Sequence, residues 1–172
     1  MKYGFLGCGN MGGAIASRLS LSTKDIAVSD RSGKARELAA SLGIAYMDNV
    51  GIATECDCIF LAVKPQMMRD VLAPLRPMLA LRKPLLVSMA AGLEIDQIQE
   101  MAGSGLPIIR IMPNTPTAVG MGVIPYCFNG FVKDRQLAAW VVDMQPCGML
   151  SPLDESLMDA ASALSGSGPA YF

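Results

Sequence analysis

The sequence predicts a doubly wound α/β fold with a mostly parallel sheet, and three observations support this fold class. Strand-sized apolar runs without polar alternation, such as residues 58–63, are typical of strands buried on both faces of a sheet. Segments with helical spacing separate successive runs, as parallel strands require. A glycine-rich turn at residues 7–13 lies at the first junction between strand and helix.

The predicted strands are short, apolar and bounded by polar residues, glycine or proline. The first, residues 2–6, ends directly at the glycine-rich turn. Those that follow lack polar alternation, which indicates burial by helices on both faces. We expect strands at residues 2–6, 26–29, 58–63, 85–89, 107–112 and 122–128, with a last short strand at 148–150.

The predicted helices alternate with these strands, except that a loop connects the strand at residues 107–112 to the one at 122–128. Ser32 is a candidate N-cap and Gly43 a C-terminal stop for a helix over residues 32–42. Pro65 begins the next helix, where its missing N–H costs nothing. The other helices are expected at residues 11–21, 94–101, 134–145 and 153–164.

Composition excludes several classes of partner. The 172 residues include 14 basic and 15 acidic side chains, and no basic stripe interleaved with aromatics predicts nucleic-acid binding. The apolar runs are far shorter than the roughly 20 residues that span a bilayer, so no membrane segment is expected. We therefore expect a protein that binds neither nucleic acid nor membrane.

The cysteines indicate a reducing compartment and no metal. Their number, five, is odd, their surroundings are mostly apolar, and the sequence contains no histidine and no C-x-x-C motif. We expect buried, inert thiols, no metal site and a cytoplasmic location.

The glycine-rich turn predicts a phosphate-binding loop. Gly7-Cys8-Gly9-Asn10-Met11-Gly12 matches G-x-G-x-x-G directly after a strand and at the opening of a helix. The first glycine permits the tight turn, the second lets the backbone approach a pyrophosphate, and the third lets helix and strand pack closely. The helix N-terminus adds N–H donors and partial positive charge. The sequence therefore predicts a Rossmann-type domain that binds a dinucleotide.

The end of the second strand gives conflicting signals about which dinucleotide binds. Asp30 follows Ser29 at the position that usually meets the adenosine ribose, where an acidic residue favours NAD. Arg31 comes next, and its guanidinium suits the 2′-phosphate of NADP. Both cofactors stay open on this evidence.

The last residues predict the start of a second domain. Residues 165–172 read as a linker followed by a helix start, with Ser167 or Gly168 as cap and Pro169 in the first turn. We expect residues 1–152 to form the dinucleotide-binding Rossmann domain. Residues 153–172 would be a connecting helix, a linker and the beginning of a truncated helical domain.

Beyond the glycine loop, four segments resemble the pyrroline-5-carboxylate reductase family. They are Ala62-Val63-Lys64-Pro65-Gln66, Ser88-Met89-Ala90-Ala91-Gly92, Arg110-Ile111-Met112-Pro113-Asn114-Thr115-Pro116 and Leu164-Ser165-Gly166-Ser167-Gly168-Pro169-Ala170-Tyr171. Each is modest alone, but their order and spacing are specific. The resemblance covers the whole chain and corresponds to about the first two thirds of a family member.

The resemblance implies the site and the reaction. The cofactor, NADP with NAD as a second possibility, would be bound by the glycine loop, by Ser29, Asp30, Arg31 and Asn49, and by Ala62, Val63, Lys64, Pro65, Ala90, Ala91, Gly92, Met112, Pro113 and Asn114. It would reduce 1-pyrroline-5-carboxylate to L-proline in a homodimer or larger homo-oligomer. An all-helical dimerisation domain, absent here, would supply the substrate loop, so this chain alone is expected to be inactive.

No catalytic residue is assigned, and two other functions stay open. A lysine beside a dinucleotide can serve as acid or base, but Lys64 lies in a segment that the family uses for cofactor binding. A β-hydroxyacid dehydrogenase-like reductase shares a similar glycine loop. A non-catalytic dinucleotide-binding module would also fit a single Rossmann domain.

Overall fold

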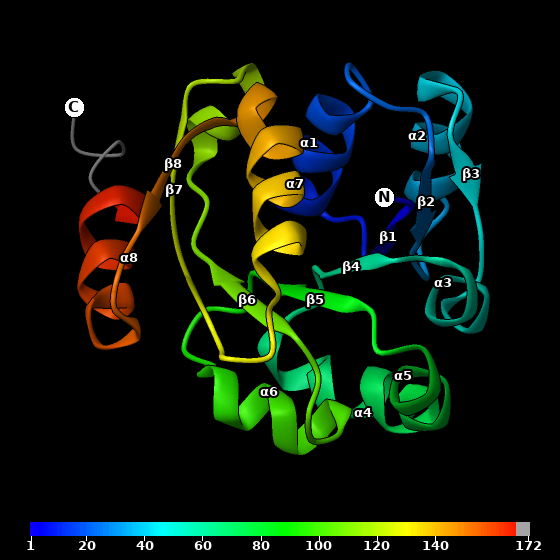
Figure 1. The fold of residues 1–172 in the computed structure, drawn as a ribbon. Coiled ribbons are helices and arrows are strands. Elements are labelled where there is room, and N and C mark those ends of the chain that lie inside the picture. Colours follow the sequence, from blue (N-terminus) through cyan, green and yellow to red (C-terminus); the bar gives the residue numbers. More distant parts are fainter. Residues whose placement is uncertain (168–172) are drawn as a thin grey trace.

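The computed structural model describes residues 1–167 of the chain and the side chains of residues 1–164. Within this part, the strands form one sheet with the order β3-β2-β1-β4-β5-β6-β7-β8 (Figure 1). The strands are β1 Tyr3–Leu6, β2 Ile26–Ser29, β3 Ala45–Tyr46, β4 Cys58–Leu61, β5 Leu85–Ser88, β6 Ile108–Ile111, β7 Gly122–Phe128 and β8 Gly148–Pro152. This is the predicted doubly wound, Rossmann-type arrangement.

The sheet is parallel except at one pairing. Strands β1 to β6 pair in parallel, β7 pairs with β6 in the antiparallel direction, and β8 pairs in parallel with β7. Only a loop and a short 3₁₀ helix, η3 (Thr115–Val119), connect β6 to β7. This connection has no crossover helix, so β7 runs back alongside β6.

Helices cover both faces of the sheet (Figure 1). The buried side chains of α1, α2 and α7 pack on one face, and those of α3, α4, α5, α6 and α8 pack on the other. The α-helices are α1 Asn10–Leu19, α2 Lys34–Leu42, α3 Asn49–Glu55, α4 Met68–Leu72, α5 Arg76–Arg82, α6 Ile95–Ala102, α7 Asp134–Met144 and α8 Met158–Ser167. The 3₁₀ helices besides η3 are η1 Pro65–Met67, η2 Ala73–Leu75, η4 Gln145–Cys147 and η5 Glu155–Leu157.

Alternate residues of the central strands face opposite helical layers. In β1, Phe5 belongs to the core beneath α1 and stacks on Phe60 of β4 with a centroid distance of 4.5 Å, whereas Leu6 belongs to the core on the other face. Both faces of these strands are therefore covered, which explains the apolar runs in the sequence.

Three predicted helices have a boundary that is wrong by two residues or more. The helix expected at residues 11–21 ends at Leu19, with Ser20 as its C-cap. Helix α2 starts at Lys34 with Gly33 as its N-cap, because the N–H of Ser32 donates to the Asp30 carboxylate and Ser32 belongs to the preceding turn. The helix expected at residues 153–164 begins as η5, where Asp154 caps Ser156, and α8 then continues to Ser167. The linker predicted from residue 165 is thus helical as far as residue 167. The predicted turn at Gly168 and Pro169 lies outside the described residues.

Gly43 ends α2 with φ 65°, as predicted. No helix within residues 1–167 has the length and apolar character needed to cross a membrane. The division into domains at residue 152 stays a prediction.

Candidate functional site

The glycine loop is packed tightly against the end of β4. Gly7 has φ +94°, and its N–H donates to the carbonyl oxygen of Ser29 at 2.8 Å. A Cβ at Gly7 would lie 2.7 Å from the carbonyl oxygen of Ala62, and one at Gly12 would lie 2.8 Å from the Ala62 Cβ. The first and third glycines therefore have the predicted roles: one permits the turn and the other the close approach of α1.

The middle glycine faces open space. Gly9 is the N-cap of α1, and a Cβ built on it would meet no atom within 4 Å. The first hydrogen bond within the helix runs from the Gly13 N–H to the Gly9 carbonyl at 2.8 Å. The N–H groups of residues 10–12 thus have no acceptor in the preceding turn, and they lie at the positive end of the helix. This open space beside free N–H donors suits a pyrophosphate, and a larger residue at position 9 would fill it.

Asp30 fastens the glycine loop to the loop after β2. One carboxylate oxygen accepts the Cys8 N–H at 2.7 Å, and the other accepts the Ser32 N–H at 2.8 Å. Burial by itself would raise the pKa of Asp30, but backbone hydrogen bonds, chiefly from Ser32 and Cys8, outweigh it and lower the pKa below its ordinary value of 3.8. Asp30 is therefore an anion with a structural role in this loop.

A cavity of about 560 Å³ opens beside this loop. It is bounded by the ends of β1, β2 and β4 and by the first turn of α3. Its lining residues are Gly7, Gly9, Ser29, Asp30, Arg31, Tyr46, Asp48, Asn49, Val50, Ala62, Val63, Lys64, Met67 and Val71.

Polar contacts shape the wall of the cavity on the β2 side. The Ser29 hydroxyl donates to the Asn49 side-chain oxygen at 2.6 Å, which ties β2 to the start of α3. The Tyr46 hydroxyl donates to the Asp30 carbonyl at 3.4 Å, and the Arg36 guanidinium lies 4.6 Å from the centre of the Tyr46 ring. An aromatic ring and exposed basic side chains thus stand at this end, a setting suited to an adenosine and its phosphate.

The structure brings nine of the predicted cofactor-binding residues together around the cavity. They are Gly7, Gly9, Ser29, Asp30, Arg31, Asn49, Ala62, Val63 and Lys64. Cys8, Asn10, Met11 and Gly12 lie in the same loop and helix start, and Pro65 begins η1 directly after Lys64. Which of these residues touch a cofactor stays a prediction.

The other predicted residues lie outside the cavity wall, in loops after β5 and β6. Ala90 and Met112 are buried, whereas Ala91 and Gly92 are exposed. The Ala90 N–H donates to the Ser88 hydroxyl at 3.3 Å. The Asn114 side-chain oxygen accepts the Val123 N–H at 3.0 Å, so Asn114 fixes the path of its own loop. These loops follow neighbouring parallel strands and so share the carboxyl edge of the sheet.

Sequence reasoning missed five residues of the cavity wall: Tyr46, Asp48, Val50, Met67 and Val71. One signal was available, because Asp48 is an N-cap type of residue just before α3 and its side chain accepts the Gly51 N–H at 2.7 Å. Tyr46 gave no comparable signal, since β3 has two residues and both are exposed.

The cysteines are buried thiols, as predicted. All five are free and buried: Cys8, Cys56, Cys58, Cys127 and Cys147. Burial raises the pKa of the Cys8 thiol to about 11, with a smaller contribution from the Asp30 charge. Although Cys8 lies within the glycine loop, its thiol is therefore protonated at neutral pH and is a poor nucleophile.

Comparison with known proteins identifies similar chains. The family model described as "NADP oxidoreductase coenzyme F420-dependent" matches residues 2–92. A pyrroline-5-carboxylate reductase of Aquifex aeolicus is 36% identical over 174 residues, covering 99% of this chain and 64% of the relative. The crystal structure of Plasmodium falciparum pyrroline carboxylate reductase with NADP bound has a TM-score of 0.89 and 35% identity, covering 99% of this chain and 64% of that one.

A more distant likeness shows the fold alone. Mycobacterium tuberculosis 3-hydroxyisobutyrate dehydrogenase has a TM-score of 0.73 at 15% identity, covering 93% of this chain and 57% of that one. The chain spans about 64% of the length of the reductases that it matches.

Proposed function

The chain belongs to the family described as "NADP oxidoreductase coenzyme F420-dependent", and on this premise we propose that it is the NADPH-binding part of a pyrroline-5-carboxylate reductase. The observation that carries the proposal is the cavity where the glycine loop, the end of β2 and the start of α3 meet. Reductases of this name match almost the whole chain at about a third identity, which supports this reaction over that of a hydroxyacid dehydrogenase.

Different residues of the chain would bind different parts of the cofactor. The free N–H groups at the start of α1, above Gly9, would hold the pyrophosphate. Arg31, exposed at the cavity wall, would pair with the 2′-phosphate. Tyr46 would lie against the adenosine, and the NADP bound by the Plasmodium falciparum relative supports this choice of cofactor.

The other half of the cofactor would lie over the carboxyl ends of β4, β5 and β6. Strand order reverses at β1: β2 is its neighbour on one side, and β4, β5 and β6 follow on the other. Dinucleotides bind across such a reversal. Val63 and Lys64, Ala91 and Gly92, and Pro113 follow these three strands in turn.

Bound NADPH would supply the hydride that reduces the imine C=N bond of 1-pyrroline-5-carboxylate, with a proton going to nitrogen, to give the amine of L-proline. The chain's contribution would be to orient the cofactor and to exclude water around it. No described side chain is assigned as acid or base. The homodimer or larger homo-oligomer that the resemblance implies and the cytoplasmic location expected from the cysteines also belong to this proposal.

A chimera tests the proposal. This chain would replace the corresponding part of the Aquifex aeolicus reductase, and NADPH oxidation and proline formation would be measured with 1-pyrroline-5-carboxylate. We expect turnover that disappears when Gly9→Val is introduced. A folded chimera that binds NADPH but forms no proline would contradict the proposed reaction, and one that binds no dinucleotide would contradict the proposed site as well.

A further inference from the structure

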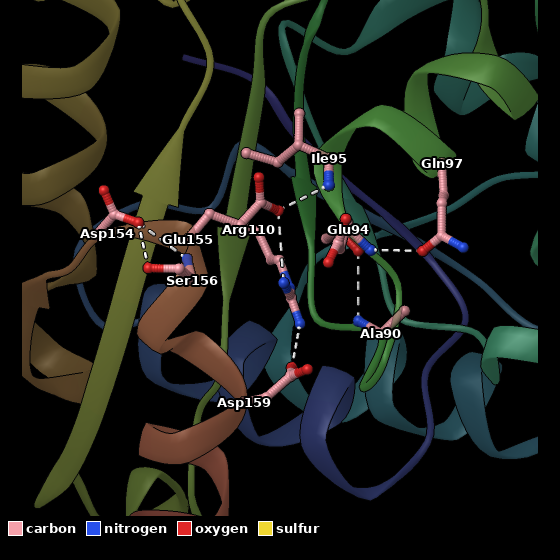
Figure 2. A network of polar contacts seen from close by, with 10 residues as sticks. Ala90, Glu94, Ile95, Gln97, Arg110, Asp154, Glu155, Ser156 and Asp159 are labelled. Atoms are coloured by element: carbon pink, nitrogen blue, oxygen red, sulfur yellow. Dashed lines mark hydrogen bonds and ion pairs between the residues drawn. The ribbon is translucent and has the colours of Figure 1, made fainter.

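Arg110 is a buried cation in the middle of the sheet. It lies on β6 with a side chain that is 1% exposed. One guanidinium nitrogen donates to Asp159 of α8 at 2.7 Å, and the other terminal nitrogen donates to Glu155 of η5 at 3.4 Å (Figure 2). Its Nε has no hydrogen-bond partner in the described structure. Because an unpaired buried charge is strongly unfavourable, Arg110 depends on these two carboxylates.

Glu155 also holds the start of another helix. The same oxygen that accepts from Arg110 accepts the Ile95 N–H at 2.8 Å, across 60 positions in the sequence. Ile95 is the first residue of α6, and its N–H has no acceptor within the helix. The next part of this turn is held locally by the capping box between Glu94 and Gln97. Glu155 thus joins β6, α6 and the segment that leads into α8 (Figure 2).

Apolar packing joins the same elements. Met158, at the start of α8, is completely buried and belongs to one core cluster with Ala90, Ile95 and Met112. Ala90 and Met112 come from the loops after β5 and β6. A displacement of η5 and α8 would therefore disturb the start of α6 through Glu155 and these loops through the shared apolar core.

These loops lie on the other side of β1 from the end of the cavity that is proposed to bind the adenosine. Asp30, Arg31 and Tyr46 mark the adenosine end beside β2, while β5 and β6 lie beyond β4 on the other side of β1. If the dinucleotide binds as proposed above, its nicotinamide half faces the loop at residues 89–94.

We propose that Arg110, Glu155 and Asp159 are positioning residues that set the loop at residues 89–94 through the start of α6, and so govern affinity for the nicotinamide half of the cofactor. The inference rests on the proposed function for the identity of the ligand. Under this proposal, a cluster outside the cavity controls the affinity for the nicotinamide half of the cofactor and leaves the affinity for the adenosine half unchanged.

The test compares two ligands: NADPH, and adenosine 2′,5′-bisphosphate, which has the adenosine and 2′-phosphate but no nicotinamide. Glu155→Ala removes the contacts of Glu155 with Arg110 and with the Ile95 N–H. It should weaken NADPH binding about tenfold, which corresponds to a modest coupling energy. Affinity for the bisphosphate should stay unchanged. Glu155→Gln keeps an acceptor for the Ile95 N–H and should recover part of the loss. Glu100→Gln removes an exposed carboxylate from α6 and is the control.

Asp159→Asn is a second variant, chosen because the Asp159 side chain is 73% exposed and its replacement leaves the core intact. It should weaken NADPH binding about threefold without affecting the bisphosphate. Equal losses for the two ligands, or no loss for NADPH in folded variants, would overturn the inference while the proposed function stands. If the unmodified protein binds neither ligand, the proposed function itself is wrong.

Discussion

The Asp30 carboxylate accepts the backbone N–H of Cys8 at 2.7 Å, which fastens the end of β2 to the glycine loop. Its other oxygen accepts the Ser32 N–H. The acidic residue that suggested NAD in the sequence is therefore engaged within the protein. Arg31 is exposed at the wall of the same cavity. We therefore assign the two residues different roles: Asp30 shapes the loop, and Arg31 is the residue proposed to bind the 2′-phosphate.

This division of roles predicts the effect of Arg31→Ala. Loss of a charge-assisted contact to the 2′-phosphate should cost about 1.5–3 kcal/mol, which weakens NADPH binding about 10- to 150-fold. NADH, which lacks that phosphate, should bind nearly as before. Dissociation constants of both cofactors, measured at one ionic strength, give the answer. Lys34→Ala, in the first turn of α2, is the matched control for loss of a nearby positive charge.

If Arg31→Ala weakens NADH and NADPH binding equally, Arg31 does not contact the 2′-phosphate. Asp30→Asn would then test the role of the other residue in cofactor binding, because it keeps one of the two oxygen acceptors but removes the negative charge beside Cys8.

Gly9→Val should impair cofactor binding, whereas Gly12→Val should lower the stability of the fold. A side chain at Gly9 enters open space, and φ there is −69°, so the fold should persist while the site for the pyrophosphate is filled. A Cβ at Gly12 would lie 2.8 Å from that of Ala62, so this variant should lose stability by overpacking, about 1–3 kcal/mol. Thermal unfolding and NADPH titration of both variants separate the effects. Unchanged affinity in Gly9→Val would contradict the assigned site.

The fold was predictable wherever both faces of an element are buried. Strands β2 and β7 have the bounds expected from the sequence, because apolar runs mark burial in the sheet. Strand β3 was not predicted, since its two residues are exposed and its place depends on pairing with β2. The connection from β6 to β7 lacks a crossover helix, as the sequence indicates, but an apolar run by itself does not give the direction of the strand, which is antiparallel.

The site was predictable in its backbone and less so in its side chains. Glycine spacing indicates the loop because Gly7 and Gly12 have no room for a Cβ, and Gly9 leaves open the space proposed for the pyrophosphate. The contact between Asp30 and Cys8 depends on a side-chain rotamer, which spacing does not encode. Arg110 gives a further signal in the sequence, because a cation within a strand that is buried on both faces must have partners of opposite charge. Those partners, Glu155 and Asp159, lie more than 40 positions further along the chain.

Tyr3→Phe should destabilise the protein without affecting the cofactor. The Tyr3 hydroxyl, completely buried on β1, donates to the Asp143 carboxylate of α7. Removing this donor leaves the carboxylate without that hydrogen bond, at a cost of about 1–3 kcal/mol. Urea unfolding measures the change, and NADPH affinity should stay the same. A loss of affinity at full stability would show that α7 influences the site.

The buried thiols predict a loss of stability at alkaline pH. Burial raises the pKa of Cys8, Cys56 and Cys127 to about 11 and that of Cys147 to about 12, from an ordinary value of 9.0. The folded protein therefore holds these protons more tightly than the unfolded chain. Their contribution to the free energy of unfolding is complete below pH 9 and is lost as pH rises toward 11 and 12.

Urea unfolding from pH 7 to pH 10 should show this decline beginning near pH 9, where thiols in the unfolded chain ionise. The double variant Cys56→Ala and Cys127→Ala, compared with its own value at neutral pH, should lose less stability over this range, because two of the responsible groups are gone. Both proteins should react slowly with a thiol reagent at neutral pH, since buried thiols become accessible only on opening. An identical alkaline decline in the variant would mean that other groups, not these cysteines, release the protons on unfolding.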